Sequence, residues 1–439
     1  MEPMLICPNC FYVTPVEGGE QEFCPWCRLK AGAPREGSLC DGTLLKLPEG
    51  TAAARSAVPL IAMIAFIFVL GFAWAVLNIM QNKVEDAVAS LRAGEDTSRW
   101  NASGGGAERS GFAAGPPVRS REAVWSRSRY GNISSDGAVS ERAIVFGTLQ
   151  GDFMGADRLK GRVLWSVPGG KSILASPAIQ GPYACAGTID GKLIGVNMDT
   201  GFEEWRLDVG LGVVSVGFVG PTVYALSADG KVAAVNVLGG KKTGEYSFES
   251  RCDSEGAIAA MLLVAPTRTG ELSAMDLQDG SIRWRAALDG GKLTRACIAG
   301  RRVFAGSETG KVFALNLADG KVLWQTEAAG GEGLSSPPAS NGVKVAALSG
   351  AGTLAVLDAT DGKLLWSAKA NGRSQAGPVM TSDLVYCGSV SGALLGFDLG
   401  SGQPVWQETP VRGQTTLLAV LDGTIYTGTV EGEAAALGR

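Results

Sequence analysis

The feature that most constrains the fold is a unit of about 40 residues that occurs eight times. Its clearest mark is a glycine, and successive copies of it stand 39 to 42 residues apart. A second glycine follows ten residues later in seven copies, and a tryptophan comes four residues after that in six. Self-similarity at this period predicts a fold built from like units that stack on one another. The first glycines are Gly151, Gly191, Gly230, Gly270, Gly310, Gly352, Gly392 and Gly432.

Each copy has the features of four short strands. In the copy at residues 306–324, GSETGKVFALNLADGKVLW, the stretch GKVFALNL is apolar on both of its faces if it is extended. Such a strand must lie between two other layers. The ADGK that follows predicts a hairpin turn in which Gly320 has a positive φ, and Trp324 in the next strand is expected to contact a neighbouring sheet. With two more strands upstream, the unit is a β-propeller blade.

The eighth copy is shorter than the others, which indicates how a ring of blades would close. The second glycine of this copy would stand ten residues after Gly432, which is beyond the last residue of the sequence. This copy therefore lacks its outermost strand. A spare strand, REAVWSR at 121–127, precedes the first copy, and its Trp125 stands 40 residues before Trp165. We expect this strand to join the last blade and to remove an exposed sheet edge. The predicted fold class for residues 120–439 is therefore all-β, an eight-bladed propeller of four-stranded antiparallel blades.

Two details of the repeat have structural interpretations. The third copy has Gly244 where the other copies have tryptophan, and Tyr246 follows two residues later, which predicts a small insertion. Asp or Asn stands six residues after the first glycine in seven copies, and this regularity favours a turn over a single catalytic site. These residues are Asp157, Asn197, Asn236, Asp276, Asn316, Asp358 and Asp398.

The glycine and tryptophan spacings together resemble the pyrroloquinoline-quinone (PQQ) type propeller repeat over about 320 residues. In quinoprotein dehydrogenases of this type, the quinone lies on the axis with a calcium ion, an aspartate acts as the base, and two adjacent cysteines form a disulfide. This chain has no Cys-Cys pair, no histidine and no haem-attaching motif. We therefore expect no enzyme activity and no PQQ. A quinone-dependent dehydrogenase, or a ligand-sensing propeller that signals across a membrane to the N-terminal region, is the alternative.

The repeat also resembles the scaffold lipoprotein of the bacterial outer-membrane β-barrel assembly machinery. This resemblance implies a scaffold of the cell envelope that binds a protein partner through its propeller loops. That scaffold is lipid-anchored and has no cysteine cluster at its start, which are two differences from this chain. The sequence does not indicate the partner or the oligomeric state.

Residues 1–55 contain a cysteine cluster that predicts a metal site. In CPNCFYVTPVEGGEQEFCPWC, two CxxC pairs are separated by 13 residues. Four thiolates in this arrangement can hold one structural Zn²⁺, so the segment resembles a zinc ribbon, although a disulfide pair or a redox CxxC is the alternative. Cys40 has no assigned role, and the cysteines of the repeats are expected to be small core residues. The predicted zinc ligands are Cys7, Cys10, Cys24 and Cys27.

A membrane-spanning helix is predicted within residues 56–80. Residues 57–77, AVPLIAMIAFIFVLGFAWAVL, carry no charge, and 21 helical residues extend about 32 Å, enough to cross the hydrocarbon core. A buried soluble helix and a cleaved signal peptide are less consistent with the length of this run and the polar residues before it. Residues 81–119 are then expected to form a juxtamembrane helix and a flexible linker, whose spacer is NASGGGAERSGFAAGPP at 101–117.

Charge and cysteine usage give the remaining expectations. The net charge of the chain is −4 and that of residues 1–55 is −2, with five basic and seven acidic residues, so nucleic-acid binding is not expected. A thiolate zinc site is easiest to maintain in a reducing cytosol. We therefore expect a single-pass protein of a bacterial inner membrane, with a cytoplasmic N-terminus and a periplasmic propeller.

Overall fold

The computed structural model describes most of the repeat region and three short strands near the N-terminus. Strands β1 (Met4–Ile6), β2 (Val13–Pro15) and β3 (Leu45–Lys46) form an antiparallel sheet in the order β2-β1-β3. They belong to one compact unit, Met1–Val84, and the rest of the chain, Glu85–Arg439, forms another. Beyond these strands, the structure describes residues 100–119, 122–328, 330–334, 336–370 and 376–438.

The predicted zinc ligands and membrane span lie outside the described residues. Cys7, Cys10, Cys24, Cys27 and residues 57–77 therefore stay predictions, as do the domain boundaries drawn around them. In the part of the chain that the structure describes, no helix is long and apolar enough to cross a membrane.

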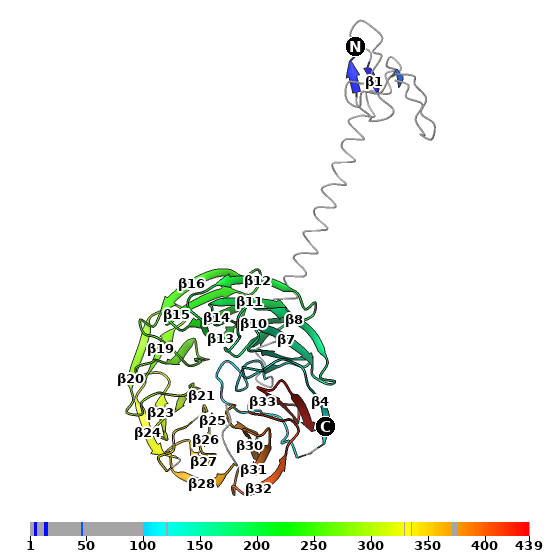
Figure 1. Ribbon diagram of the computed structural model, residues 1–439. Coiled ribbons are helices and arrows are strands. Elements are labelled where there is room, and N and C mark those ends of the chain that lie inside the picture. Colours follow the sequence, from blue (N-terminus) through cyan, green and yellow to red (C-terminus); the bar gives the residue numbers. More distant parts are fainter. Residues whose placement is uncertain are drawn as a thin grey trace. The chain divides into compact units, whose positions relative to one another are not determined.

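The second unit is a ring of eight four-stranded antiparallel sheets, which confirms the predicted propeller (Figure 1). The first strand of each blade is innermost, and the innermost strands of successive blades are neighbours around the axis. Blades 1 to 4 consist of β5 Ala138–Val139, β6 Ala143–Gly147, β7 Asp152–Asp157 and β8 Val163–Pro168; β9 Ala178–Gln180, β10 Tyr183–Gly187, β11 Lys192–Asn197 and β12 Glu203–Asp208; β13 Val213–Val219, β14 Thr222–Ser227, β15 Lys231–Asn236 and β16 Lys241–Ser247; β17 Ala257–Ala259, β18 Leu262–Pro266, β19 Glu271–Asp276 and β20 Ile282–Ala287. Blades 5 to 8 consist of β21 Cys297–Ala299, β22 Arg302–Gly306, β23 Lys311–Asn316 and β24 Val322–Glu327; β25 Ala339–Ser340, β26 Lys344–Leu348, β27 Thr353–Asp358 and β28 Leu364–Lys369; β29 Val379–Met380, β30 Leu384–Gly388, β31 Leu394–Asp398 and β32 Pro404–Glu408; β33 Thr415–Leu421, β34 Thr424–Thr429, β35 Ala434–Gly438 and β4 Ala123–Arg127.

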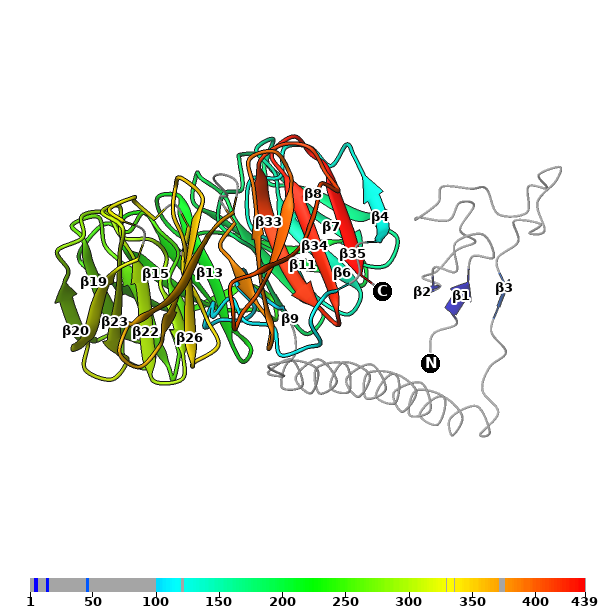
Figure 2. The same cartoon turned by 90° about the horizontal axis from the view of Figure 1, so that it is seen from below.

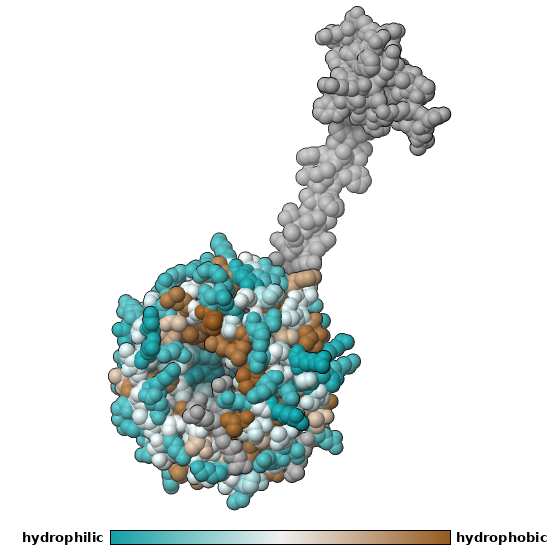
Figure 3. Space-filling view, viewed as in Figure 1, coloured by the Kyte–Doolittle hydropathy of each residue, from teal (hydrophilic) through white to brown (hydrophobic). Residues whose placement is uncertain are grey.

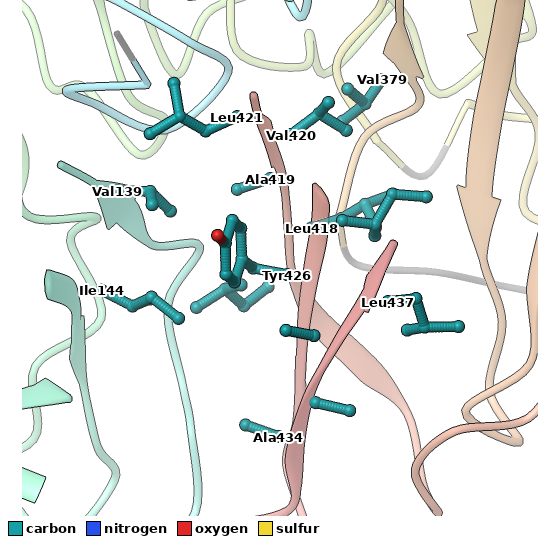
Figure 4. Packing of buried hydrophobic residues seen from close by; sticks show 14 of the residues in the cluster. Val139, Ile144, Val379, Leu418, Ala419, Val420, Leu421, Tyr426, Ala434 and Leu437 are labelled. Atoms are coloured by element: carbon teal, nitrogen blue, oxygen red, sulfur yellow. The ribbon is translucent and has the colours of Figure 1, made fainter. Parts of the chain in front are cut away.

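The closure of the ring follows the prediction. Strand β4 lies beside β35 (Figure 2). The two strands pair antiparallel, and Trp125 lies opposite Ala436. The largest hydrophobic cluster lies where blade 8 meets blades 1 and 7, and in Figure 4 Tyr426 of blade 8 lies beside Val139 and Ile144 of blade 1. The first strand of the propeller, β4, thus closes the ring as the outermost strand of blade 8.

The repeated tryptophan joins neighbouring blades, as its fixed position indicates. The ring of Trp284 in blade 4 covers Gly320 in blade 5, where a Cβ atom would stand 2.6 Å from the indole. The Trp284 Nε1–H donates a hydrogen bond of 2.8 Å to the carbonyl of Leu317. Gly320 has a φ of +69°, so both its conformation and this contact exclude a side chain. The same contact pairs Trp125 with Gly161, Trp165 with Gly201, Trp205 with Gly240, Trp324 with Gly362 and Trp366 with Gly402.

The insertion predicted in the third copy is wrong. Gly244 lies opposite Ala234, as Trp284 lies opposite Ala274 in the next blade, so the register is unchanged. Tyr246 is two residues further along β16 and therefore on the same face. Its ring covers Gly280 of blade 4, the glycine that a tryptophan would otherwise cover. An aromatic side chain from the next position on that face makes the contact between these blades.

The Asp and Asn residues of the repeat are turn residues, as predicted. The Oδ1 of Asp157 accepts hydrogen bonds of 2.9 and 3.0 Å from the amides of Leu159 and Lys160. The Oδ1 of Asn316 likewise accepts one of 2.8 Å from the amide of Ala318. These side chains stabilise the hairpin between the third and fourth strands of a blade.

Candidate functional site

Residues 100–118 form the centre of the propeller, and we call them the belt. The prediction of a flexible spacer at 101–117 is wrong, because the belt is hydrogen-bonded to six of the eight innermost strands and all but three of its residues are buried or half-buried. Figure 1 shows it in cyan, crossing the middle of the ring. The innermost strands donate amide hydrogen bonds of 2.6 to 2.9 Å to belt carbonyls: Val139 to Trp100, Ile179 to Asn101, Ile258 to Ala107, Ile298 to Glu108, Ser340 to Ser110 and Met380 to Gly111.

The small residues that suggested flexibility are what let the belt approach the strands closely. A Cβ atom on Gly111 would collide with Ala339, and one on Gly104 would stand 3.1 Å from the carbonyl oxygen of Arg109. Both glycines also have a positive φ. Glycine here permits close packing of backbone on backbone, which a composition-based interpretation cannot distinguish from a linker.

The two ends of the ring differ. At one end, which we call the belt face, tight turns such as the one between Ala259 and Leu262 join the first and second strands of each blade, and the belt runs beside them. At the other end, the cavity face, loops lead from one blade to the next. On the cavity face an axial cavity of about 490 Å³ opens, which is large enough for a small molecule or a protruding side chain. Its walls include Asp136, Ser176, Asp253, Glu255, Arg295 and Thr416.

A buried arginine of the belt lies beneath this cavity. The Arg109 side chain is 2% exposed, and all its guanidinium nitrogens donate hydrogen bonds. The Nε donates to the carbonyl of Gly256 (2.7 Å), and one terminal nitrogen donates to Glu255 (2.9 Å). The other terminal nitrogen donates to the Ser215 hydroxyl (3.2 Å) and to the carbonyl of Val216 (3.0 Å). Arg109 therefore ties the belt to blades 3 and 4.

A second arginine and two carboxylates complete this cluster. Arg295 lies 2.6 Å from Glu255 and 3.9 Å from Asp136, and it also donates to the hydroxyl of Ser103 in the belt. Burial alone would raise the pKa of Glu255, but the charges of Arg109 and Arg295 and a hydrogen bond from Ser176 outweigh burial and hold the pKa at about 2. Burial raises the pKa of Asp136 despite its proximity to Arg295. We call Arg109, Asp136, Glu255 and Arg295 the axial cluster.

The axial cluster does not fit the calcium-bound quinone of the dehydrogenases that the repeat resembles. The Glu255 oxygens accept hydrogen bonds from Arg109, Arg295 and the amide of Ser176, while those of Asp136 accept from Ser103 and the amide of Leu418. Among the described residues, no group of three or more His, Cys, Asp or Glu side chains could hold a metal ion. The cluster is thus built to hold the belt in place.

Sequence analysis missed the axial cluster, although the repeat contains a signal for it. Asp136, Ser176, Ser215, Glu255 and Arg295 each lie three residues before the strand residue that faces the axis at the belt. Five successive blades therefore have a polar side chain at one repeat position, where an all-apolar core would be expected. Aligning the loops between blades, as well as the glycines, would have revealed this.

Exposed apolar residues lie beside the axial cavity on the cavity face. Leu149, Leu174, Ile189 and Leu211 are 41 to 61% exposed, and we call them the apolar rim. Their loops are contiguous, because the Ser172 hydroxyl donates to the Leu149 carbonyl (2.6 Å) and the Ile189 amide donates to the Ser172 carbonyl (2.9 Å). Figure 3 shows hydrophobic residues near the hollow at the centre of the ring. Grouped exposed apolar side chains are typical of protein-binding surfaces.

The fold and the site together define a closed eight-bladed propeller of the PQQ-like repeat class, with an internally paired axis and an apolar rim on one face. The chain belongs to the PQQ_2 family, described as outer membrane protein assembly factor BamB, which matches residues 87–260 and 254–439. The factor BamB of Shewanella oneidensis is 24% identical over 184 residues, which are 37% of this chain. That match spans 46% of the Shewanella protein, about half its length.

Solved structures show the same fold at low identity. BamB from Moraxella catarrhalis has a TM-score of 0.59 at 17% identity, covering 73% of this chain and all of that one. The computationally designed Ika8 protein has a TM-score of 0.61 at 18% identity, and the match covers 74% of this chain and all of the designed chain. Sqt1 of Saccharomyces cerevisiae has a TM-score of 0.62 at 12% identity, and the match covers 72% of this chain and 99% of Sqt1. These similarities concern the architecture alone.

Proposed function

We propose that this protein is a non-catalytic scaffold of the bacterial cell envelope that binds a partner protein during outer membrane protein assembly. Membership of the BamB-described family supports this role. The observation that carries the proposal is the apolar rim on the cavity face. A rigid ring that presents apolar side chains beside a polar cavity offers a fixed docking surface. The partner would contribute an apolar surface of its own.

The test is site-specific photocrosslinking in intact cells, with the crosslinker at Leu174 or Leu211. We expect crosslinks to a component of the outer membrane assembly machinery, identified by mass spectrometry. Phe202 is the matched control, because it is 74% exposed and lies on a hairpin turn of the neighbouring blade 2. Equal crosslinking from Phe202 to the same component would contradict the proposed surface. Leu211→Asp should lower the amount of folded outer membrane β-barrel proteins, whereas Phe202→Asp should not.

We also propose that Cys7, Cys10, Cys24 and Cys27 bind one structural Zn²⁺. Metal analysis of the full chain should find about one zinc per molecule, the number one four-thiolate site holds. Cys24→Ser should lower this content, and Cys40→Ser is the matched control that should leave it unchanged. Unchanged zinc in Cys24→Ser would reject the ligand assignment.

Residues 57–77 are proposed to anchor the chain in the inner membrane, with the propeller in the periplasm. Their length and lack of charge support this. The propeller cysteines are compatible with an oxidising compartment, because Cys185, Cys252, Cys297 and Cys387 are buried and form no disulfide within the described part of the chain. Protease added to spheroplasts should digest the propeller and spare a tag at the N-terminus. Digestion of the tag with protection of the propeller would reverse the orientation.

A further inference from the structure

The belt contacts the innermost strand of blade 3 through the Arg109 side chain, but in the described part of the chain its backbone makes no hydrogen bond to that strand. Phe218 of β13 corresponds to Ile258 of β17, since each precedes the residue that closes the first hairpin of its blade. In that register the amide points away from the second strand and toward the axis. The Ile258 amide donates to the Ala107 carbonyl, but in the described part of the chain the Phe218 amide makes no such bond to the belt. The belt turns back on itself here, where Ala102 and Gly105 exchange backbone hydrogen bonds.

A cavity of about 450 Å³ lies on the belt face next to this strand. Its walls combine polar and apolar surface, and Phe112, Phe218, Val219 and Met261 supply apolar side chains. Gly220, in the turn beyond Val219, also lines this cavity. Phe218, whose amide faces the axis, is therefore itself a wall residue of this cavity.

The cavity has one charged group among its described walls. Glu108 lines it, and among the described residues its carboxylate has no ion-pair partner, whereas its backbone carbonyl is bonded to Ile298. Burial raises the pKa of Glu108, which indicates that its carboxyl group is partly removed from water. A ligand with a positive charge next to its apolar part would complement this wall.

The turn that forms the far wall is strained. Ala260 and Met261 have φ values of +48° and +61°, whereas Gly181, Gly220 and Gly300 supply the positive φ in the corresponding turns of blades 2, 3 and 5. An alanine or methionine in this region costs roughly 1 to 2 kcal/mol relative to ordinary backbone. The strained turn places the Met261 side chain at the cavity, and methionine adapts readily to different apolar ligands.

We propose that this cavity binds an extended segment of a partner protein that carries an apolar side chain and a neighbouring basic side chain. The belt supplies the template, because its own extended backbone binds six other blades by accepting the same amide hydrogen bond. The segment continues that interface across blade 3: its carbonyl accepts the Phe218 amide, its apolar side chain enters the cavity, and its basic group pairs with Glu108. This site is on the opposite face from the apolar rim and is independent of it.

The experiment uses fluorescein-labelled, end-blocked octapeptides and the full-length protein. A peptide of alternating leucine and lysine should bind, as measured by fluorescence anisotropy, while an alternating leucine and glutamate peptide should bind at least about tenfold more weakly because of like-charge repulsion. Met261→Lys should weaken the binding of the leucine-lysine peptide by about tenfold. Glu108→Gln should weaken its binding by about threefold, as expected for the loss of a partly exposed ion pair. Leu211→Lys is the matched control on the cavity face and should have no effect.

Hydrogen exchange provides a second measurement that does not depend on charge. The amides of Phe218 to Gly220 should exchange more slowly when the leucine-lysine peptide is added. The exchange rate of the Val420 amide in blade 8 should stay the same. Equal binding of the two peptides, or an effect of Leu211→Lys as large as that of Met261→Lys, overturns the proposal. Absence of binding to the intact chain also overturns it, and would assign the cavity to another segment of this chain or to a second copy.

Discussion

Replacing Arg109 should reveal how much of the stability of the ring depends on the belt. Arg109→Met keeps the apolar stem but removes four hydrogen bonds and the charge that faces Glu255. Removing one partner of a buried ion pair costs about 3 to 5 kcal/mol, since it leaves the other charge and its neighbours uncompensated. We expect a loss of this size in the free energy of unfolding, measured by urea denaturation with tryptophan fluorescence at pH 7.

A matched control lies one residue beyond the belt. Arg119 pairs with Asp383 at 3.4 Å, but the two side chains are 61% and 49% exposed. Such surface pairs contribute about 0 to 1 kcal/mol, so Arg119→Met should be nearly neutral. The double variant Arg109→Met/Glu255→Gln should recover part of the loss, because it no longer leaves Glu255 charged without Arg109.

The pH dependence gives an independent check with a defined sign. The pKa of Glu255 is held at about 2 in the folded protein, against 4.5 for an unperturbed glutamate. The stability that this shift contributes is present above pH 4.5 and is lost as the pH falls toward 2, and its full size is about 3 kcal/mol. Arg109→Met should therefore lose less stability than the wild type between pH 5 and pH 3. Asp136 acts in the opposite direction because its pKa is raised. The reasoning is refuted if Arg109→Met is as mild as Arg119→Met, or if the two pH profiles are parallel.

Four further predictions concern closure of the ring, the tryptophan hydrogen bond, the buried thiols and backbone strain. Trp125→Ala should destabilise the propeller by about 3 to 5 kcal/mol in urea, because it removes the ring over Gly161. Trp125→Phe should cost about 1 kcal/mol more than Trp165→Phe, because Trp125 donates to the Arg158 carbonyl while the Trp165 Nε1 has no hydrogen-bond partner among the described residues. Burial raises the pKa of Cys252, Cys297 and Cys387 to about 12, so iodoacetamide should label these thiols only after unfolding; rapid labelling of the native protein would contradict their burial. Ala260→Gly should raise the unfolding free energy by about 0.5 to 1 kcal/mol, and a decrease would mean that the turn is not strained.

The propeller could be predicted from the sequence because each blade repeats the same local chemistry. Position 320 requires glycine for two reasons: its φ is positive, and the indole of Trp284 lies against it. The spacing between this glycine and the tryptophan of the preceding copy is therefore fixed by a physical contact. Trp125 could be assigned to the last blade by the same spacing. Tyr246 shows the limit of this reasoning, since spacing within the sequence cannot show that a side chain two positions along a strand reaches the same glycine.

The axial cluster and the belt could not be predicted in the same way, because their contacts are non-local. Arg109 bonds residues 106 to 147 positions away in the chain, and the Val118 amide donates to the Tyr386 hydroxyl, 268 positions away. The segment NASGGGAERSGFAAGPP has no periodicity that would predict such contacts. Only the position of Asp136, Glu255 and Arg295 before their strands indicated that polar groups would meet on the axis.

The same non-local contacts explain the composition that made the belt look like a linker. The belt binds both the first blade and the seventh blade in chain order. The Trp406 indole of blade 7 also donates to the Val118 carbonyl at the junction with blade 8. The belt therefore cannot reach its final contacts until the last blades exist, and closing a loop of this length is entropically costly and slow. A segment that stays in water during that time is safer with Gly, Ala and Ser than with large apolar side chains, which would promote aggregation. Backbone hydrogen bonds and Arg109 then supply the stability that a larger apolar surface would otherwise provide.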